Sequence, residues 1–135
     1  MVGPVKETQA MIAGMNATRM PGLFVFCATT DPAQAARLAP QALATCREAE
    51  GLSLILPVEQ AETEGFDTSL PMVRITLQVH SALDGVGLTA AVATALAEAG
   101  IPCNMVAGYH HDHAFVPAPQ ADAALAILRL RAAQG

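Results

Sequence analysis

Residues 72–117, MVRITLQVHSALDGVGLTAAVATALAEAGIPCNMVAGYHHDHAFVP, decide the fold. Between residues 73 and 80, apolar and polar side chains alternate, which is typical of a half-buried strand. Over residues 88–99 the apolar residues recur at helical spacing, and the Gly-Ile-Pro that follows marks the end of a helix. Residues 103–117 then indicate two short strands joined by a polar turn near His111. This order of strand, helix and hairpin predicts most of a split βαβ unit.

The order of these elements also predicts which of their ends meet. The helix returns the chain so that the next strand runs parallel to the first, and the hairpin sends the last strand back beside the first. The end of the first strand at His80, the helix start at Asp84–Gly87 and the turn at Tyr109–His113 should therefore share one edge of the sheet. Loops held at such an edge are where binding sites are commonly built.

Two runs of this stretch carry a resemblance to a known family. RITLQVHSALDGVGLTAAVATALAEAGIP (Arg74–Pro102) and NMVAGYHHDHAFVP (Asn104–Pro117) resemble a bacterial family of small ACT-domain-like proteins. The upstream run CREAEGLSLIL (Cys46–Leu56) is similar to another block of that family, and the resemblance extends from about residue 23 to residue 130. It implies a ferredoxin-like α+β fold, a tandem of two ACT-like halves with no attached catalytic domain, and regulation by a bound amino acid.

The resemblance gives the expected division of the chain. Residues 1–69 would form an amino-terminal ACT-like half and residues 70–135 a carboxy-terminal βαββα half, the two making one compact body. The second half lacks a fourth strand, which Leu23–Thr29 is expected to supply. Cys46 and His110 depart from the family pattern, which has aromatic residues there; the departures leave the fold unaffected, and no metal site is taken from the family.

Turn residues and periodicity predict the remaining elements. The acidic residues Glu59, Glu62 and Glu64 are interpreted as a solvated helix face. The expected elements are a helix over Val5–Met15, a strand over Leu23–Thr29, a helix from Asp31-Pro32 to about Leu38, a hairpin of Ala42–Arg47 and Leu52–Leu56 with positive φ at Gly51, a helix over Val58–Glu64, and a last helix starting at Pro119.

Composition limits the class of protein. Hydrophobic residues make up 53% of the 135 residues and charged ones only 14%, which indicates a well-buried chain whose surface is covered in part by a second copy, as in a homodimer. A net charge of −5, with seven Lys and Arg and no basic run, argues against a nucleic-acid or anionic-membrane partner.

The cysteines and the amino terminus indicate the compartment. Cys27, Cys46 and Cys103 are odd in number and widely spaced, which favours reduced, buried thiols over disulfides or a zinc site. The first residues lack the pattern of a signal peptide, and no apolar run approaches the ~20 residues that span a bilayer. We therefore expect a cytoplasmic protein.

The first candidate site is the loop Ser81–Gly87. Free N–H groups at the positive end of the following helix favour a carboxylate, and Gly85 and Gly87 let a ligand approach the backbone. Asp84, Asp112 or a main-chain carbonyl could accept hydrogen bonds from the ammonium group of an amino acid. The alternative is purely structural: Ser81 and Asp84 fit a capping box, and the glycines shape the entry to the helix.

The second candidate site is the turn Tyr109–His113, with His80 at the same edge. A polar hairpin turn, a polar contact to a ligand, and a metal site formed by His80, His110, His111 and His113 are all compatible with this pattern, although no helical metal-binding spacing occurs. The predicted ligand-binding residues are His80, Ser81, Asp84, Gly85, Val86, Gly87, Tyr109, His110, Asp112 and His113; no cofactor, metal ligand or catalytic residue is predicted.

Catalysis is not favoured by the sequence. His80 and Ser81 are neighbours on a strand and should point to opposite faces, and no nucleophile elbow or phosphate-binding glycine motif is present. The sequence therefore favours a small-molecule-binding regulatory protein that is not an enzyme. A self-associating interaction module without a ligand is the alternative.

Overall fold

The computed structural model describes residues 8–79 and 85–134, and the chain forms two compact units. Unit 1 combines residues 1–21 with residues 73–135, and unit 2 is residues 22–72. From the sequence, residues 1–21 were expected in the other half, with the boundary at 69/70. That the two halves make one body stays a prediction.

Four strands form the sheet of unit 1 in the order β1-β5-β7-β6. They are β1 (Ala17–Arg19), β5 (Met72–Leu77, whose first residue is counted with unit 2), β6 (Asn104–Ala107) and β7 (Asp112–Pro117). β1 is antiparallel to β5, and β6 is antiparallel to β7. The predicted sequence of strand, helix and hairpin is therefore confirmed.

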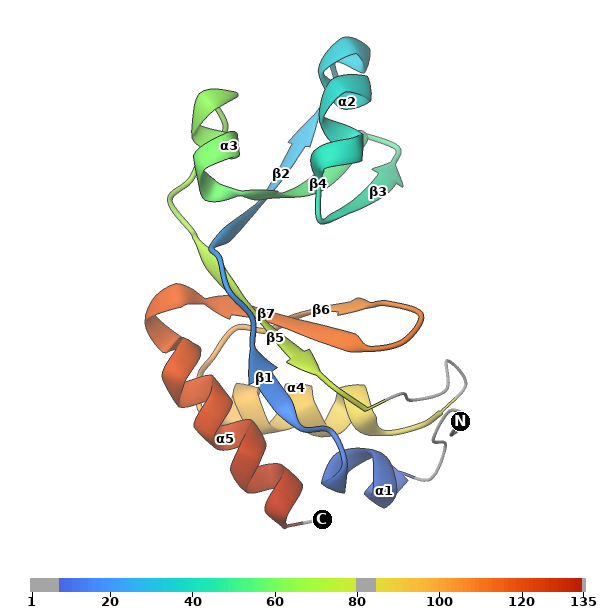
Figure 1. Ribbon diagram of the computed structural model, residues 1–135, viewed down its shortest axis with the longest axis vertical. Helices are drawn as coiled ribbons and strands as arrows, with labels where there is room; N and C mark the ends of the chain where they lie inside the picture. The colour runs from blue at the N-terminus through green and yellow to red at the C-terminus, as the bar shows by residue number, and fades with distance from the viewer. Residues whose placement is uncertain (1–7, 80–84, 135) are drawn as a thin grey trace. The chain divides into compact units, whose positions relative to one another are not determined.

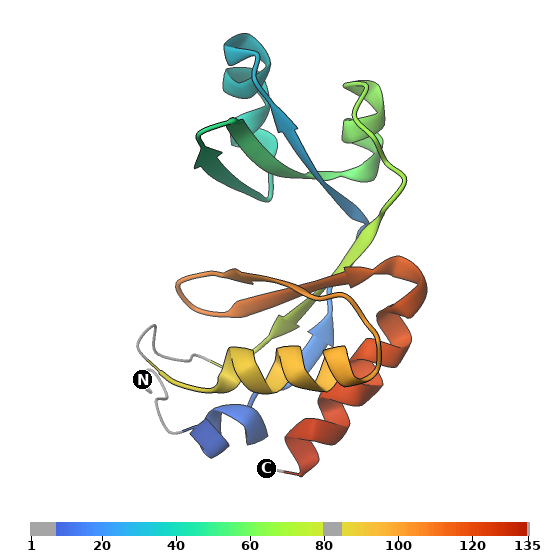
Figure 2. The same ribbon diagram turned by 180° about the vertical axis from the view of Figure 1, so that it is seen from behind.

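Three helices pack on one side of this sheet, as Figures 1 and 2 show. They are α1 (Thr8–Ala13), α4 (Leu88–Glu98) and α5 (Ala121–Ala133), the last preceded by a 3-10 turn η2 (Ala118–Gln120). Alternation along β5 turns Val73, Ile75 and Leu77 into the core between the layers, and each is fully buried. The helices contribute side chains at helical spacing: Met11, Ile12, Leu88, Val92, Leu96, Ala121, Ala124 and Leu128.

Unit 2 repeats the pattern on a smaller scale. Its strands β2 (Phe24–Thr29), β3 (Ala44–Glu48) and β4 (Gly51–Pro57) lie in the order β3-β4-β2 and are antiparallel. Its helices are α2 (Pro32–Leu38), continued by a 3-10 turn η1 (Ala39–Gln41), and α3 (Val58–Thr63). The core is a cluster of five buried side chains: Val25, Leu38, Leu54, Leu56 and Ala61.

Local sequence explains how two elements of unit 2 begin. The carboxylate of Asp31 accepts a hydrogen bond of 3.0 Å from the backbone N–H of Ala33, and Pro32 occupies the first helical position, as predicted. Gly51 has φ +143°, and a Cβ there would lie 2.5 Å from the carbonyl oxygen of Thr29. The predicted positive φ is therefore confirmed, and the close approach to β2 is a second reason why this residue is a glycine.

The prediction that Leu23–Thr29 supplies the fourth strand of unit 1 holds only in part. The strand β2 (Phe24–Thr29) is next to β5 in the strand order, but it pairs with β5 through Phe24 and Met72 and with β4 over six residues. The strand that completes the sheet of unit 1 is β1, which pairs with residues 75–77 of β5. β1 has only three residues, too few for an alternating pattern to be recognised in the sequence.

The cysteines are free thiols, but their predicted burial is wrong for Cys46, which is exposed on β3. Cys27 and Cys103 are half-buried, and burial raises the pKa of each thiol. Among the described residues, no helix has both the length and the apolar character that a membrane crossing would require.

Candidate functional site

One hydrogen bond fixes the end of unit 1 at which the candidate residues lie. The hydroxyl of Thr76, near the end of β5, is 2.9 Å from Nδ1 of His113, near the start of β7. The end of β5 therefore lies beside the turn that joins β6 to β7. Figures 1 and 2 place that turn and the first residues of α4 at the same end of this unit.

The start of α4 is built on Gly87. This residue is the N-cap at φ +105°, a left-handed conformation that glycine adopts without a steric penalty. Its carbonyl accepts the first helical hydrogen bond, 2.9 Å from the N–H of Ala91. Glycine has no side chain with which to cap the helix. In the part of the chain that the structure describes, no side chain caps the N–H groups of Leu88, Thr89 and Ala90.

Thr8 of α1 lies directly on this helix start, a contact that was not predicted from the sequence. Its hydroxyl donates a hydrogen bond to the carbonyl of Val86, and its methyl group is so near Gly87 that a Cβ there would lie 2.5 Å from Cγ2. The glycine therefore has a packing role besides its conformational one. The side chain of Val86 is 73% exposed, so this residue projects from the site rather than filling it.

The turn between β6 and β7 spans Gly108–His111, and it closes with a hydrogen bond of 2.9 Å from the N–H of Gly108 to the carbonyl of His111. Tyr109 and His110 are exposed at its tip, with their rings edge to face at 5.2 Å between centroids. The turn therefore presents two adjacent aromatic rings to solvent. Asp112, expected within the turn, is the first residue of β7.

Strand alternation separates Asp112 from His113. Ala114 and Val116 belong to the core beneath the helices, so Asp112 lies on the helix side of the sheet and His113 on the opposite face. Burial lowers the pKa of His113, electrostatic interactions with Arg74 and His111 lower it further, and Asp112 opposes the shift. The structure thus brings His113 to Thr76, across the sheet from the start of α4.

The predicted residues His80, Ser81 and Asp84 lie outside the described residues, and the predicted capping box lies with them. Gly85, Val86 and Gly87 lead directly into α4, which begins at Leu88. Within residues 8–79 and 85–134, no group of three His, Cys, Asp or Glu side chains is placed to hold a metal ion. One member of the four-histidine hypothesis, His80, is not among those residues.

Comparison with protein families identifies both halves of the chain. A family described as ACT domain matches residues 4–72, and a second family with the same description matches residues 73–129. The border between the matches coincides with the structural border between Met72 and Val73, whereas residues 4–21 of the first match belong to unit 1 in the structure. No curated protein matches the sequence.

Solved structures show the same architecture. A Vibrio cholerae protein of unknown function, described as a possible transport protein, is 42% identical over 92% of this chain and 94% of its own, with a TM-score of 0.81. An Agrobacterium tumefaciens protein is 15% identical over 86% of this chain and 87% of its own (TM-score 0.63). The regulatory subunit of aspartate kinase from Thermus flavus is 11% identical over 85% of this chain and 95% of its own (TM-score 0.58). At these lower identities the likeness is one of fold.

Proposed function

The chain belongs to the ACT-domain family, as two tandem ACT domains, and on this premise we propose that it is a non-catalytic regulatory protein of the cytoplasm that binds an amino acid. ACT domains are typically regulatory modules that bind small molecules. The Thermus flavus neighbour, a regulatory subunit, has the same fold as a separate chain. The proposal concerns the ligand, its site and the absence of catalysis in this protein.

The observation that carries the proposal is the glycine start of α4. The first turn of a helix presents N–H groups and a positive dipole end, which stabilise a carboxylate. Gly87 leaves those N–H groups without a side-chain cap from the described residues, and the turn between β6 and β7 lies at the same end of the unit. We assign the ligand's carboxylate to the N–H groups of Leu88, Thr89 and Ala90.

The remaining part of an amino acid needs an acceptor for its ammonium group. Asp112 lies on the helix side of the sheet at the end that holds the start of α4, so its carboxylate is the described group best placed for this role. The exposed rings of Tyr109 and His110 would form the outer wall. His80, Ser81 and Asp84 precede this helix start in the sequence and remain part of the proposed site, whereas His113 is assigned to the pairing of β5 with β7.

A thermal-shift screen of the twenty amino acids at millimolar concentration tests this proposal. A ligand that binds only the folded protein at 100 times its dissociation constant stabilises it by about 2.7 kcal/mol, which raises the unfolding midpoint by several degrees. The expected result is such a rise for one amino acid or a chemically related group. No rise for any of them would contradict the proposal.

A matched pair of variants at the exposed Val86 locates the site. Val86→Asp places a negative charge before α4, where it should repel a carboxylate while stabilising the free helix. Val86→Asn introduces a side chain of nearly the same shape as that of Asp but without the charge. Binding of the amino acid found in the screen should weaken about tenfold or more in Val86→Asp and stay within about twofold in Val86→Asn. Equal binding by both variants would place the ligand elsewhere.

A second function, self-association without a ligand, is favoured by the surface of unit 2. Phe26 and Leu70 are 44% and 55% exposed, and both line a hollow of about 290 Å³. Exposed apolar side chains in one region are typical of a protein–protein interface. A second copy of this chain is the partner we propose for this surface.

Sedimentation at micromolar concentration tests the self-association. The wild type should sediment as a dimer, and Phe26→Asp combined with Leu70→Asp should sediment as a monomer with unchanged circular dichroism. Leu130→Asp is the matched control, because Leu130 is 61% exposed on α5 in unit 1. A monomeric wild type, or a double variant that remains dimeric, would contradict this second function.

A further inference from the structure

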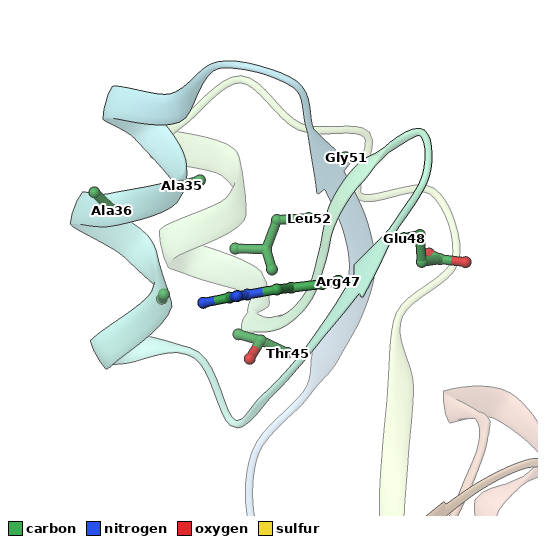
Figure 3. Close-up of a pocket in the computed structure, with 8 residues that line it drawn as sticks. Ala35, Ala36, Thr45, Arg47, Glu48, Gly51 and Leu52 are labelled. Carbon is green, nitrogen blue, oxygen red and sulfur yellow. The ribbon is translucent and has the colours of Figure 1, made fainter.

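A cleft in unit 2 lies between α2 and the hairpin of β3 and β4, whereas the site proposed at α4 belongs to unit 1. Its volume is about 440 Å³, within the range of about 300–1,000 Å³ that small-molecule sites occupy. Every residue that lines it belongs to unit 2, so the cleft is complete within that unit. Figure 3 shows the view into it, with α2 on one side and the hairpin on the other.

The cleft exists because α2 faces the hairpin with alanines. Ala35 and Ala39 line the helix side, and only Leu38 of α2 is fully buried in the core of unit 2. A methyl group is too short to fill the space between a helix and the strands beneath it. Leu52 of β4 forms an apolar floor between them (Figure 3). The walls therefore suit a short aliphatic group.

One cation extends into this apolar space. Thr45 and Arg47 alternate onto the same face of β3, and Figure 3 shows the side chain of Arg47 running across the cleft toward α2, beside Thr45. Within the described residues, the guanidinium of Arg47 makes no hydrogen bond or ion pair, whereas Arg37 of α2 is paired with Glu64. Arg47 is thus available to an anion from outside.

The neighbouring carboxylate does not neutralise that cation. Glu48 points away from the cleft in Figure 3, as the alternation along β3 requires, and it accepts a hydrogen bond from the hydroxyl of Ser53. The hairpin passes close to β2 at Gly51, where a Cβ would lie 2.5 Å from the carbonyl oxygen of Thr29. No other acidic side chain lines the cleft among the described residues.

We infer that this cleft is a second ligand site, which takes a short aliphatic carboxylate such as a branched 2-oxo acid. The fork of the Arg47 guanidinium matches a carboxylate in two parallel hydrogen bonds, and the hydroxyl of Thr45 can donate to a neighbouring oxygen. The aliphatic end lies against Ala35, Ala39 and Leu52. Because the only lining carboxylate points away, the cleft offers no acidic partner for an ammonium group and favours the oxo acid over the matching amino acid.

Titration of the full chain with 4-methyl-2-oxopentanoate, followed by amide resonances in solution, tests this inference. The expected result is a saturable shift of the amides of Ala35, Arg47 and Leu52 at millimolar ligand. Leucine, with an ammonium in place of the oxo group, and 4-methyl-2-pentanone, without the carboxylate, should bind at least about tenfold more weakly. No shift at these amides, or equal binding of the neutral ketone, would overturn the inference.

Variants separate this site from the one at α4. Arg47→Met keeps the length of an exposed side chain and should lose about tenfold or more in affinity, with Arg47→Lys in between. Ala35→Leu fills the cleft and should abolish binding, while Ala33→Leu, exposed on the same helix, should not. Val86→Asp should leave this titration unchanged, so failure at α4 would not be mistaken for failure here. Unaltered binding in Arg47→Met or Ala35→Leu would overturn the assignment.

Discussion

The two units differ in what holds their helices to their strands. In unit 1, three helices bury an apolar cluster that includes Met11, Leu96 and Leu128, each at most 1% exposed. In unit 2, two short helices rest on five buried side chains, and an ion pair joins Arg37 of α2 to Glu64 beyond α3 at 2.6 Å. The same family architecture therefore tolerates a small core, and the alanines that keep that core small leave the cleft beside Arg47.

Removing one core side chain from each unit tests most directly whether the two cores are separate. Leu38→Ala in unit 2 and Leu96→Ala in unit 1 both truncate a fully buried leucine, which costs about 2–5 kcal/mol. Leu38 is the only fully buried residue of α2. Amide hydrogen exchange should therefore show protection lost through unit 2 in Leu38→Ala, with unit 1 still protected.

Equal loss of protection in both units of Leu38→Ala would mean that they unfold as one body. The claim that each unit unfolds around its own core would then be wrong, and the single compact body predicted from the sequence would be favoured. Leu96→Ala is the reciprocal control, because its effect should be centred on the amides of α4 and β5.

The glycines at the start of β4 and at the N-cap of α4 differ in what surrounds them. Gly51→Ala should cost about 3 kcal/mol, because a positive φ is combined with a clash against the backbone oxygen of Thr29, which cannot move away. Gly87→Ala should cost less, because its clash is with the side-chain methyl of Thr8. Urea unfolding measures both, with Gly65→Ala as the control, since Gly65 has φ +83° but no neighbour within 4 Å.

A rescue experiment distinguishes the two cases. Thr8→Ser removes the methyl group and keeps the hydroxyl that donates to Val86, so it should recover part of the stability lost in Gly87→Ala. Absence of any recovery would contradict the packing of Thr8 on the start of α4.

The ion pair between Arg37 and Glu64 in unit 2 predicts that the stability of the protein falls at acid pH. The hydrogen bonds from Arg37 and Gln34 lower the pKa of Glu64 to about 2, from 4.5. The carboxylate of Glu64 binds a proton more readily in the unfolded state. The contribution of the ion pair to the free energy of unfolding is therefore complete above pH 4.5 and is lost as the pH falls toward 2. The unfolding midpoint of Glu64→Gln should therefore fall less over this range than that of the wild type. Glu62→Gln, exposed on α3, should behave as the wild type does.

The smallest expected effect concerns His113 in unit 1. Its pKa is lowered from 6.5 by burial and by Arg74 and His111, so folding favours the neutral ring. The contribution of the neutral His113 ring to the free energy of unfolding is complete above pH 6.5 and decreases as the pH falls below that value. His113→Asn, which keeps a polar partner for Thr76, should make the melting temperature less dependent on pH between about 5 and 7. An unchanged dependence would contradict this assignment.

Periodicity in the sequence predicted those helices and strands that bury one face and expose the other. Ile75 and Leu77 alternate with polar residues, and Leu88, Val92 and Leu96 recur at helical spacing, so β5 and α4 could be predicted from the local sequence pattern. The strand β1 could not be predicted, because three residues are too few to show an alternating pattern. The contact of Thr8 with Val86 joins residues 78 positions apart, and the pair of Arg37 with Glu64 joins residues 27 apart. Local sequence patterns carry no signal for such contacts, so Glu64 was interpreted as solvated.

For the candidate site, the sequence predicted the helix start and the polar turn but not the side of the sheet each residue occupies. His113 belongs to β7 rather than to the turn, and this placement gives it Thr76 as its partner. The glycine at position 87 was expected either to let a ligand approach the backbone or to shape the entry to the helix, and φ +105° and the methyl of Thr8 give it the second role. Conformation and long-range packing, which set both features, cannot be obtained from residue types alone.

The most direct test of the proposed function is the response of the backbone amides of Leu88, Thr89 and Ala90 to an added amino acid, measured by NMR on the full chain. Binding of its carboxylate at the start of α4 predicts saturable shifts of these three amides, lost in Val86→Asp and kept in Val86→Asn. Amides that stay in place with every amino acid, or that shift equally in both variants, would contradict it.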